Sequence, residues 1–164
     1  MAEIADKRAL MLAAGVRLVV FDVDGVLTNG TVEVDESGRE SRRYSMRDGH
    51  GFELLRDAGI GAIWMTRSAH SPSIVFRAYK LGVNVCSGIK DKAAKLAELY
   101  ERPEEICYVG DDVFDLEAMR YAGFSACPAD AENAVKEEAD YVCRNTGGHG
   151  AAREVIELIL SCHA

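Results

Sequence analysis

The sequence has no apolar run of the roughly 18 residues that a membrane-spanning helix needs, and residues 1–15 lack the apolar centre of a signal peptide. It also has no basic stripe, because its net charge of -8 comes from acidic residues spread along the chain. Nucleic acid and anionic membranes are therefore poor partners. The five cysteines show no CxxC spacing, which disfavours zinc and predicts reduced thiols. Together these absences predict a cytoplasmic protein that binds neither nucleic acid nor membrane.

No linker, internal repeat or low-complexity tract divides the chain. Its 164 residues are 48% hydrophobic and 28% charged, which gives enough apolar material for the core of one globular domain. We therefore expect a single domain over residues 1–164, with a short amphipathic helix within residues 1–15.

Short apolar runs alternate with helical patterns along most of the chain. Near-continuous apolar runs are typical of parallel strands that are buried on both faces. Gly59, Gly82 and Gly123 follow helical segments, where C-terminal caps belong. The pattern predicts an α/β fold with a doubly wound parallel sheet, whose ligands bind at the carboxyl ends of the strands. We expect strands at residues 18–21, 62–65, 83–86, 106–109 and 141–143, and helices at residues 51–58, 71–81, 91–100, 115–122, 131–138 and 150–160.

One segment interrupts this alternation. Residues 31–35 and 40–46 flank a turn that contains Gly38, which predicts a projecting β-hairpin just after the first strand. Such a hairpin can serve as a lid or as a contact between subunits. No other segment is long enough to form a separate cap domain, so we expect an open active site unless a neighbouring subunit covers it.

Two carboxylates, Asp22 and Asp24, follow the first strand. Residues two apart in an extended chain point the same way, so both side chains can face one ligand. One carboxylate can attack phosphorus to form an aspartyl-phosphate, while the other protonates the leaving oxygen and later activates water. Acidic residues at strand ends also act as caps or bind structural cations, and the pair alone does not exclude those roles.

A second acidic cluster follows residues 106–109, with Asp111, Asp112 and Asp115 leading into a helix. Two acidic clusters at the ends of parallel strands form the oxygen-rich kind of site that Mg²⁺ prefers. Asp112 or Asp115 can instead cap the helix that begins at Leu116. Two roles stay open for Asp115. It can cap this helix, or it can hold the metal ligands in place without binding the metal itself.

A transferring phosphoryl group also needs donors and positive charge around its oxygens. Thr66 ends the strand at residues 62–65 and can donate its hydroxyl, while Lys92 opens the helix after residues 83–86. Taken alone, each residue fits a helix N-cap or a solvated surface position better. Lys90 is the alternative to Lys92.

These four elements, in this order, resemble the four motifs of the haloacid dehalogenase superfamily. More narrowly, the chain resembles the capless branch that contains 3-deoxy-D-manno-octulosonate 8-phosphate phosphatase, phosphatases of nine-carbon keto-acid phosphates, and a phosphatase-like domain attached to animal sialate cytidylyltransferases. The matching segments are FDVDGVLTNG at residues 21–30, the hairpin, RDGHGFELL at 47–55, YVGDDVFD at 108–115 and GGHGAAREV at 147–155.

The resemblance implies roles for the matching residues. Asp22 would be the nucleophile and a metal ligand, Asp24 the general acid and base and a metal ligand through its carbonyl, and Asp111 a further ligand of Mg²⁺. Thr66 and Lys92 would hold the phosphoryl group. The resemblance also implies a homotetramer with associated hairpins, which hydrolyses a small sugar-acid phosphate of lipopolysaccharide or sialic acid biosynthesis.

Four residues could meet the carboxylate of a sugar acid: Arg47, His50, Arg67 and His149, with Lys90 as a further candidate. Arginine offers a planar fork to a carboxylate, and histidine can donate from either ring nitrogen. Surface charge is the alternative role for most of these residues.

Three other functions are open on the sequence. A phosphatase for a different small metabolite would keep the same catalytic residues. A phosphotransferase is disfavoured, because it needs a closed cap to exclude water from its intermediate. A phosphatase-like assembly module would have to retain Asp22, Asp24, Lys92 and Asp111 without using them.

Overall fold

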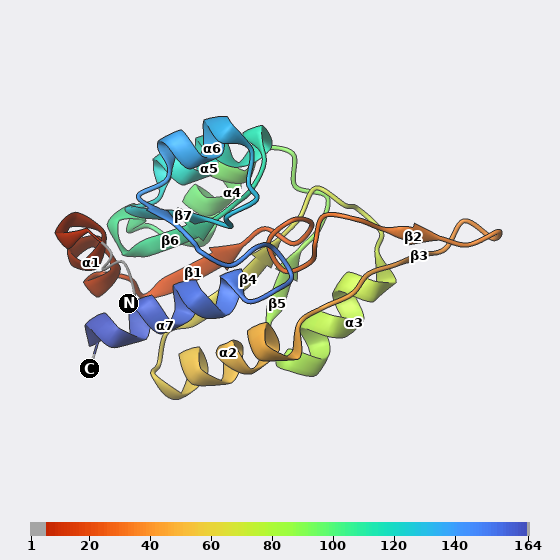
Figure 1. The fold of residues 1–164 in the computed structure, drawn as a ribbon, viewed down its shortest axis with the longest axis horizontal. Coiled ribbons are helices and arrows are strands. Elements are labelled where there is room, and N and C mark those ends of the chain that lie inside the picture. The colour runs from red at the N-terminus through yellow and green to blue at the C-terminus, as the bar shows by residue number, and fades with distance from the viewer. Residues whose placement is uncertain (1–5, 164) are drawn as a thin grey trace.

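A six-stranded parallel sheet forms the centre of the protein in a computed structural model that describes residues 6–163 (Figure 1). The strands lie in the order β5-β4-β1-β6-β7-β8. β1 therefore lies inside the sheet, with β4 on one side and β6 on the other. The strands are β1 (Leu18–Phe21), β4 (Gly61–Met65), β5 (Asn84–Cys86), β6 (Ile106–Val109), β7 (Phe124–Cys127) and β8 (Tyr141–Val142).

Helices cover both faces of the sheet (Figure 1). One face carries α1 (Lys7–Ala14), α2 (Met46–Asp57), α3 (Pro72–Leu81) and α7 (Ala151–His163). The other face carries α4 (Lys92–Leu99), α5 (Leu116–Tyr121) and α6 (Asn133–Glu138), and two short 3-10 helices, η1 (Pro103–Glu105) and η2 (Val113–Asp115), flank β6. The architecture is the predicted doubly wound α/β fold.

The residues of β1 show why the strands have continuous apolar sequences. Val19 and Phe21 belong to the apolar cluster under α2 and α7, whereas Leu18 and Val20 belong to the cluster on the opposite face. Successive side chains of a strand point to opposite faces, and both faces of this sheet are covered. All four residues are consequently buried.

Helix α2 begins well before the predicted residue 51. Ser45 caps it, because its Oγ accepts the backbone N–H of Asp48 at 3.2 Å. The missed residues 46–50 contain Gly49, and glycine is a poor helix former. In the fold the start of α2 packs so closely on α3 that a Cβ on Gly49 would lie 2.6 Å from Nη2 of Arg77 and 3.3 Å from Cδ2 of Leu81. Tertiary packing therefore outweighs helix propensity here.

Strand β7 is missing from the prediction. Its sequence contains Ser125 and an alanine after Phe124, and Gly123 before it resembles a helix cap. The buried Ser125 is satisfied by Asp140, whose Oδ2 accepts from the serine N–H at 3.0 Å and from its hydroxyl at 2.9 Å. Gly123 does not cap a helix but donates its N–H to the carbonyl of Pro103 at 2.7 Å. A distant partner thus permits a polar residue in a buried strand.

The predicted hairpin is present and projects from the sheet (Figure 1). Its antiparallel strands β2 (Glu33–Val34) and β3 (Glu40–Ser41) are shorter than expected. Asp35 closes the turn by accepting two backbone N–H groups, at 2.8 and 3.0 Å. The prediction of strand structure at residues 42–46 is wrong, because Arg42 turns inward and the following residues lead into α2.

Several smaller expectations can be compared with the structure. The helix expected within residues 1–15 is α1, and residues 1–5 lie outside the described part of the chain. Gly59 and Gly82 adopt left-handed conformations, with φ of +72° and +67°, which confirms two of the helix caps. All five cysteines are free thiols, as predicted. Between residues 6 and 163, no helix is both long enough and apolar enough to cross a membrane.

Candidate active site

The side chains predicted to act in catalysis and metal binding meet at the carboxyl edge of the sheet, around the end of β1. The chain runs from β1 to β4 and β5 on one side and later returns through β6 on the other side, so a topological switch point lies between β1 and β6. A cavity of about 290 Å³ opens there. Its lining residues are Asp22, Asp24, Gly30, Thr66, Arg67, Ser68, Lys92, Asp111, Asp112, Phe114 and Asp115.

Lys92 links two carboxylates of this cavity. Its Nζ lies 2.5 Å from Oδ1 of Asp22 and 2.6 Å from Oδ1 of Asp115. Lys92 is 3% exposed and Asp115 is 1% exposed, so water screens these charges little. Burial alone would lower the pKa of Lys92, but the two carboxylates raise it above its ordinary value. Lys92 is therefore a charged ammonium in contact with the candidate nucleophile.

Asp115 holds both Lys92 and the loop that follows β6 in place. Its Oδ1 also accepts a hydrogen bond from the Tyr108 hydroxyl at 2.8 Å. Its Oδ2 accepts the backbone N–H groups of Asp111 at 3.1 Å and Asp112 at 3.2 Å. Asp112 in turn caps η2. Asp115 makes no side-chain hydrogen bond to the first turn of α5, so the considered capping of the helix from Leu116 is absent. Its carboxylate instead closes the capping box of η2 and contacts Lys92.

The cluster carries more negative charge than one lysine can offset. Carboxylate oxygens of Asp22, Asp111 and Asp115 lie within 4.8 Å of one another. Burial, together with the neighbouring carboxylates, raises the pKa of Asp22 to about 7 and that of Asp111 to about 8. Among the described residues, the buried Oδ1 of Asp111 has no hydrogen-bond partner. A hard divalent cation such as Mg²⁺ would supply both the missing charge and the missing partner.

Asp22 and Asp111 are the carboxylates best placed to bind such a cation. The oxygens of Asp115 already accept four hydrogen bonds, from Lys92, Tyr108 and two backbone N–H groups. A carboxylate has about four lone-pair positions in total. Asp115 therefore has no free lone pair to offer a metal ion. That the backbone carbonyl of Asp24 binds the metal stays a prediction.

Gly25 allows the two acidic loops to come together. Its φ is +99°, a conformation that residues with a Cβ rarely adopt. A Cβ at this position would lie 1.9 Å from Oδ2 of Asp111. Thr28 stabilises the turn, because its Oγ1 accepts the N–H groups of Gly25 at 3.3 Å and Gly30 at 3.2 Å. The glycine after Asp24 is thus required by the approach of the second acidic cluster.

Thr66 lies at the end of β4 and is 2% exposed. Its Oγ1 accepts the backbone N–H of Ser68 at 3.1 Å. A hydroxyl that accepts in this way still has its own hydrogen to donate. Because Thr66 lines the cavity, this hydrogen is available for donation to a ligand there.

Asp24 is paired with Arg42, a residue that sequence reasoning missed. Nε of Arg42 lies 2.6 Å from Oδ1 of Asp24, and Nη2 lies 3.3 Å from Oδ2. The signal available in the sequence was weak. Neighbouring residues of an extended chain face opposite sides, so one of Arg42 and Arg43 had to face the molecule.

The residues predicted to meet a sugar-acid carboxylate do not share one site in this chain. Arg67 lines the cavity that contains Asp22. Arg47 lines a separate, larger depression of about 600 Å³. Neither His50, on α2, nor His149 is among the residues that line either depression. Of the four candidates, Arg67 is the one that lines the cavity with Asp22, Asp24 and Asp111.

Comparison with known proteins gives a consistent result. A profile of the haloacid dehalogenase-like hydrolases matches residues 68–155. The chain is 37% identical over 153 residues to the 3-deoxy-D-manno-octulosonate 8-phosphate phosphatase KdsC of Yersinia pestis, and the match covers 90% of this chain and 81% of that protein.

Solved structures show the same similarity. The Yersinia pestis phosphatase has a TM-score of 0.92 and 34% identity, and the match covers 96% of this chain and 87% of that one. The Moraxella catarrhalis phosphatase, solved with a magnesium ion, a phosphate ion and a KDO molecule, has a TM-score of 0.92 and 32% identity over 96% of this chain and 92% of that one. Since the family profile spans more than half of the chain and these relatives match most of the remainder, the chain belongs to the haloacid dehalogenase-like hydrolases.

Proposed function

We propose that this protein is a Mg²⁺-dependent phosphatase that hydrolyses 3-deoxy-D-manno-octulosonate 8-phosphate or a nine-carbon analogue. The buried contact of 2.5 Å between Lys92 and Asp22, in a cavity that also contains Asp24 and Asp111, carries the proposal. A carboxylate paired with an ammonium, with a second carboxylate two residues further on, suits attack on phosphorus and proton transfer. The relatives compared above are phosphatases of this substrate class.

In the first step, a carboxylate oxygen of Asp22 forms a bond to phosphorus while the bond from phosphorus to the sugar oxygen breaks. Asp24 gives a proton to that leaving oxygen, so the products are an aspartyl-phosphate and the free sugar acid. Lys92 and Thr66 donate to the phosphoryl oxygens and stabilise their charge in the transition state.

In the second step, the ionised Asp24 takes a proton from a water molecule that attacks phosphorus. The bond between phosphorus and Asp22 then breaks, which releases inorganic phosphate and restores both side chains to their starting states. Among residues 6–163 no separate cap domain covers the site. Water therefore has access to phosphorus, which favours hydrolysis over phosphotransfer.

Asp22 and Asp111 would hold the metal ion, together with the carbonyl of Asp24. When bound, Mg²⁺ offsets the repulsion between the Asp22 carboxylate and a dianionic phosphate.

We propose Arg67 as the contact for the carboxylate of the sugar acid. Its guanidinium lies 4.1 Å from the centre of the Phe114 ring, and this cation–π contact supports it at the rim of the cavity. A planar guanidinium can bind a carboxylate through two parallel hydrogen bonds. Arg47, His50 and His149 would contact a substrate only if the assembly brings them from another subunit.

We further infer a cytoplasmic homotetramer in which hairpins associate. Apolar side chains are exposed on the hairpin and on α3: Val34 is 62% exposed, Phe76 69% and Tyr79 82%. A two-stranded hairpin is marginally stable alone in water, so contacts with other subunits would stabilise it. The free thiols suit a reducing compartment. An eight-carbon substrate would place the enzyme in lipopolysaccharide biosynthesis, and a nine-carbon substrate in biosynthesis of a sialic-acid-like product.

A phosphate-release screen with Mg²⁺ tests this function. It compares eight- and nine-carbon keto-sugar acid phosphates with glucose 6-phosphate, and the Asp22→Asn variant is the blank. We expect kcat/KM to favour one keto-acid phosphate by at least about tenfold, because a hydrogen bond to a charged group contributes about 1.5–3 kcal/mol and each step of about 1.4 kcal/mol is a factor of about ten. Equal turnover of all substrates would indicate a phosphatase of another small metabolite. No release above the blank, with assembly unchanged, would indicate an assembly module.

A further inference from the structure

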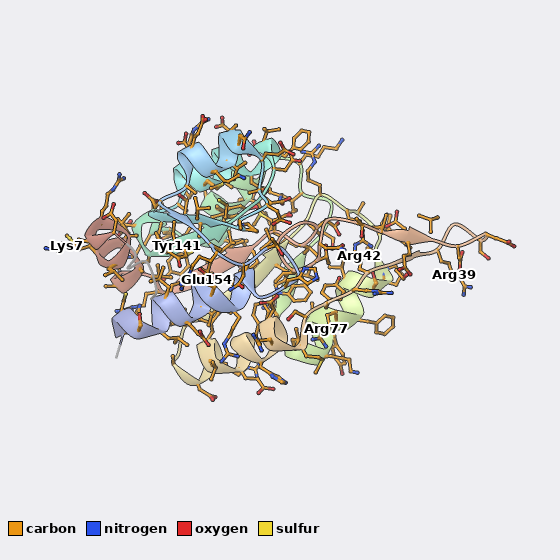
Figure 2. All side chains as sticks on the ribbon, in the orientation of Figure 1. Lys7, Arg39, Arg42, Arg77, Tyr141 and Glu154 are labelled. Atoms are coloured by element: carbon orange, nitrogen blue, oxygen red, sulfur yellow. The ribbon has the colours of Figure 1, made fainter. Side chains whose placement is uncertain are left out.

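We propose that Arg42 positions the Asp24 carboxylate for proton transfer, an inference that rests on the function proposed above. Arg42 follows β3 at the base of the hairpin (Figure 2). Its side chain is nevertheless 3% exposed. Arginine is almost never fully buried unless it is paired, so its partners identify its role.

The guanidinium of Arg42 joins three segments of the chain. On one side it engages both carboxylate oxygens of Asp24, at 2.6 and 3.3 Å. On the other side its Nη1 donates to Oγ of Ser71 at 2.8 Å and Oγ of Ser73 at 3.3 Å. Its Nη2 also donates to Glu40 at 3.1 Å. A rigid planar group with partners on both sides holds the carboxylate in one orientation, which a single ammonium cannot do.

Ser71 supplies an independent observation. It occupies the N-cap position of α3, where a serine hydroxyl ordinarily accepts a backbone N–H of the first helical turn. Ser71 makes no such hydrogen bond, although it is 6% exposed. Its hydroxyl accepts from Arg42 instead. Where a buried residue departs from a local rule of this kind, function is the common reason.

Asp24 can still act on a substrate while it is held in this way. Each carboxylate oxygen offers two lone-pair positions, and Arg42 takes one on each. The side chain of Asp24 is 34% exposed and lines the cavity, whereas Arg42 is not among the lining residues. Arg42 therefore acts through Asp24, as a positioning residue.

The importance of this positioning depends on the leaving group. A sugar alkoxide is a poor leaving group and needs a proton from Asp24 as its bond to phosphorus breaks. p-Nitrophenolate is stable enough to leave without one. Removal of Arg42 should therefore slow release of a sugar much more than release of p-nitrophenol.

The test compares kcat/KM for two substrates, the sugar-acid phosphate that the wild type prefers and p-nitrophenyl phosphate. Arg42→Ala should lose about 100-fold on the sugar phosphate and less than about fivefold on the aryl phosphate, as expected for a misplaced general acid. Arg42→Lys should regain about tenfold on the sugar phosphate, because its ammonium can still pair with Asp24. The matched control is Arg43→Ala, since Arg43 is 89% exposed and lies 3.7 Å from Glu33. It should stay within about twofold of wild type on both substrates.

Equal losses on both substrates would mean that Arg42 only supports the fold, and would overturn the inference. Circular dichroism and gel filtration show whether Arg42→Ala folds. If it does not, the same comparison is made with Arg42→Lys and Ser71→Ala: the loss of kcat/KM on the sugar phosphate is divided by the loss on the aryl phosphate. A wild type that releases phosphate from neither substrate would overturn the proposed function, and this inference with it.

Discussion

Nζ of Lys92 lies 2.5 Å from Oδ1 of Asp22, and the two side chains are 2% and 10% exposed. This contact joins the start of α4 to the end of β1. Removal of one partner of a buried ion pair leaves the other charge uncompensated, which destabilises the fold as well as the site. Replacements at the two positions must therefore be chosen so that chemistry and folding are separated.

Asp22→Asn keeps the shape of the side chain and an oxygen that can accept from Lys92. An amide cannot act as the nucleophile, so kcat should fall by at least about 10³-fold, within the range for removal of a nucleophile. Phosphate release measures this, and circular dichroism checks the fold. Wild-type turnover by a sample of confirmed mass would assign the nucleophile elsewhere.

Lys92→Ala should lower kcat/KM by about 10² to 10³-fold, because a preorganised charged donor to the phosphoryl group is lost. Lys90→Ala is the matched control, since this exposed lysine lies two positions earlier. It should stay close to wild type in the same steady-state assay, and circular dichroism checks that both variants are folded, because loss of Lys92 leaves buried carboxylates unpaired. The reverse result, with Lys92→Ala active and Lys90→Ala impaired, would transfer the role to Lys90.

Mg²⁺ should stabilise the wild-type protein, because a ligand that binds only the folded state raises its stability. Thermal melting after EDTA treatment, with and without added Mg²⁺, measures this without an activity assay. Asp111→Asn should melt higher than the wild type in EDTA, because one of three crowded carboxylates is neutralised. It should also lose the Mg²⁺ response. An unchanged response in Asp111→Asn would exclude this residue as a metal ligand.

Asp48 ties α2 to the start of α7. Its carboxylate accepts the backbone N–H of Arg153 at 2.9 Å and that of Gly150 at 3.3 Å. Asp48→Ala should lower the free energy of unfolding by about 1–3 kcal/mol, the cost of leaving buried donors unpaired. Urea denaturation measures this, with Glu53→Ala on an exposed position of α2 as the control. Equal stabilities of the two variants would contradict the capping role.

Glu154 should make stability depend on pH. Burial alone would raise its pKa, but hydrogen bonds from Arg144, Tyr141 and Asn145 lower it below the ordinary 4.5; Figure 2 shows Glu154 beside Tyr141. A lowered acid pKa gives stability that is present above pH 4.5 and is lost as pH falls through the folded-state pKa. The urea concentrations at the midpoint of unfolding of wild type and Glu154→Gln should therefore differ at pH 7 and become equal as the pH is lowered to about 3. A difference in stability between the two proteins that does not change with pH would argue against the lowered pKa of Glu154 as its cause.

Much of the fold could be predicted because its signals are local. Each residue of β1 is buried on one covered face or the other, so the apolar run itself identifies the strand. β7 could not be predicted in this way, since burial of Ser125 depends on Asp140, which lies in a different segment. The start of α2 was hidden because Gly49 has low helix propensity but suits the close contact with α3.

The same distinction between local signals and distant contacts applies to the candidate site. Asp22, Thr66 and Asp111 each follow a parallel strand, and the carboxyl ends of such strands meet at one edge. Their convergence could be predicted from order alone. The pairing of Arg42 with Asp24 could not, because it depends on how the chain bends after the hairpin.

The position of β1 between β4 and β6 also governs when the protein can become active. Leu18 pairs with Ile106, so the centre of the sheet is closed by residues far apart in the chain. Contacts of this kind form slowly during folding, and chains emerge from the ribosome from the N-terminus. A nascent chain that ends at α3 contains the proposed nucleophile Asp22 but neither Lys92 nor Asp111. Catalytic competence therefore arises late in synthesis, when β6 completes the centre of the sheet.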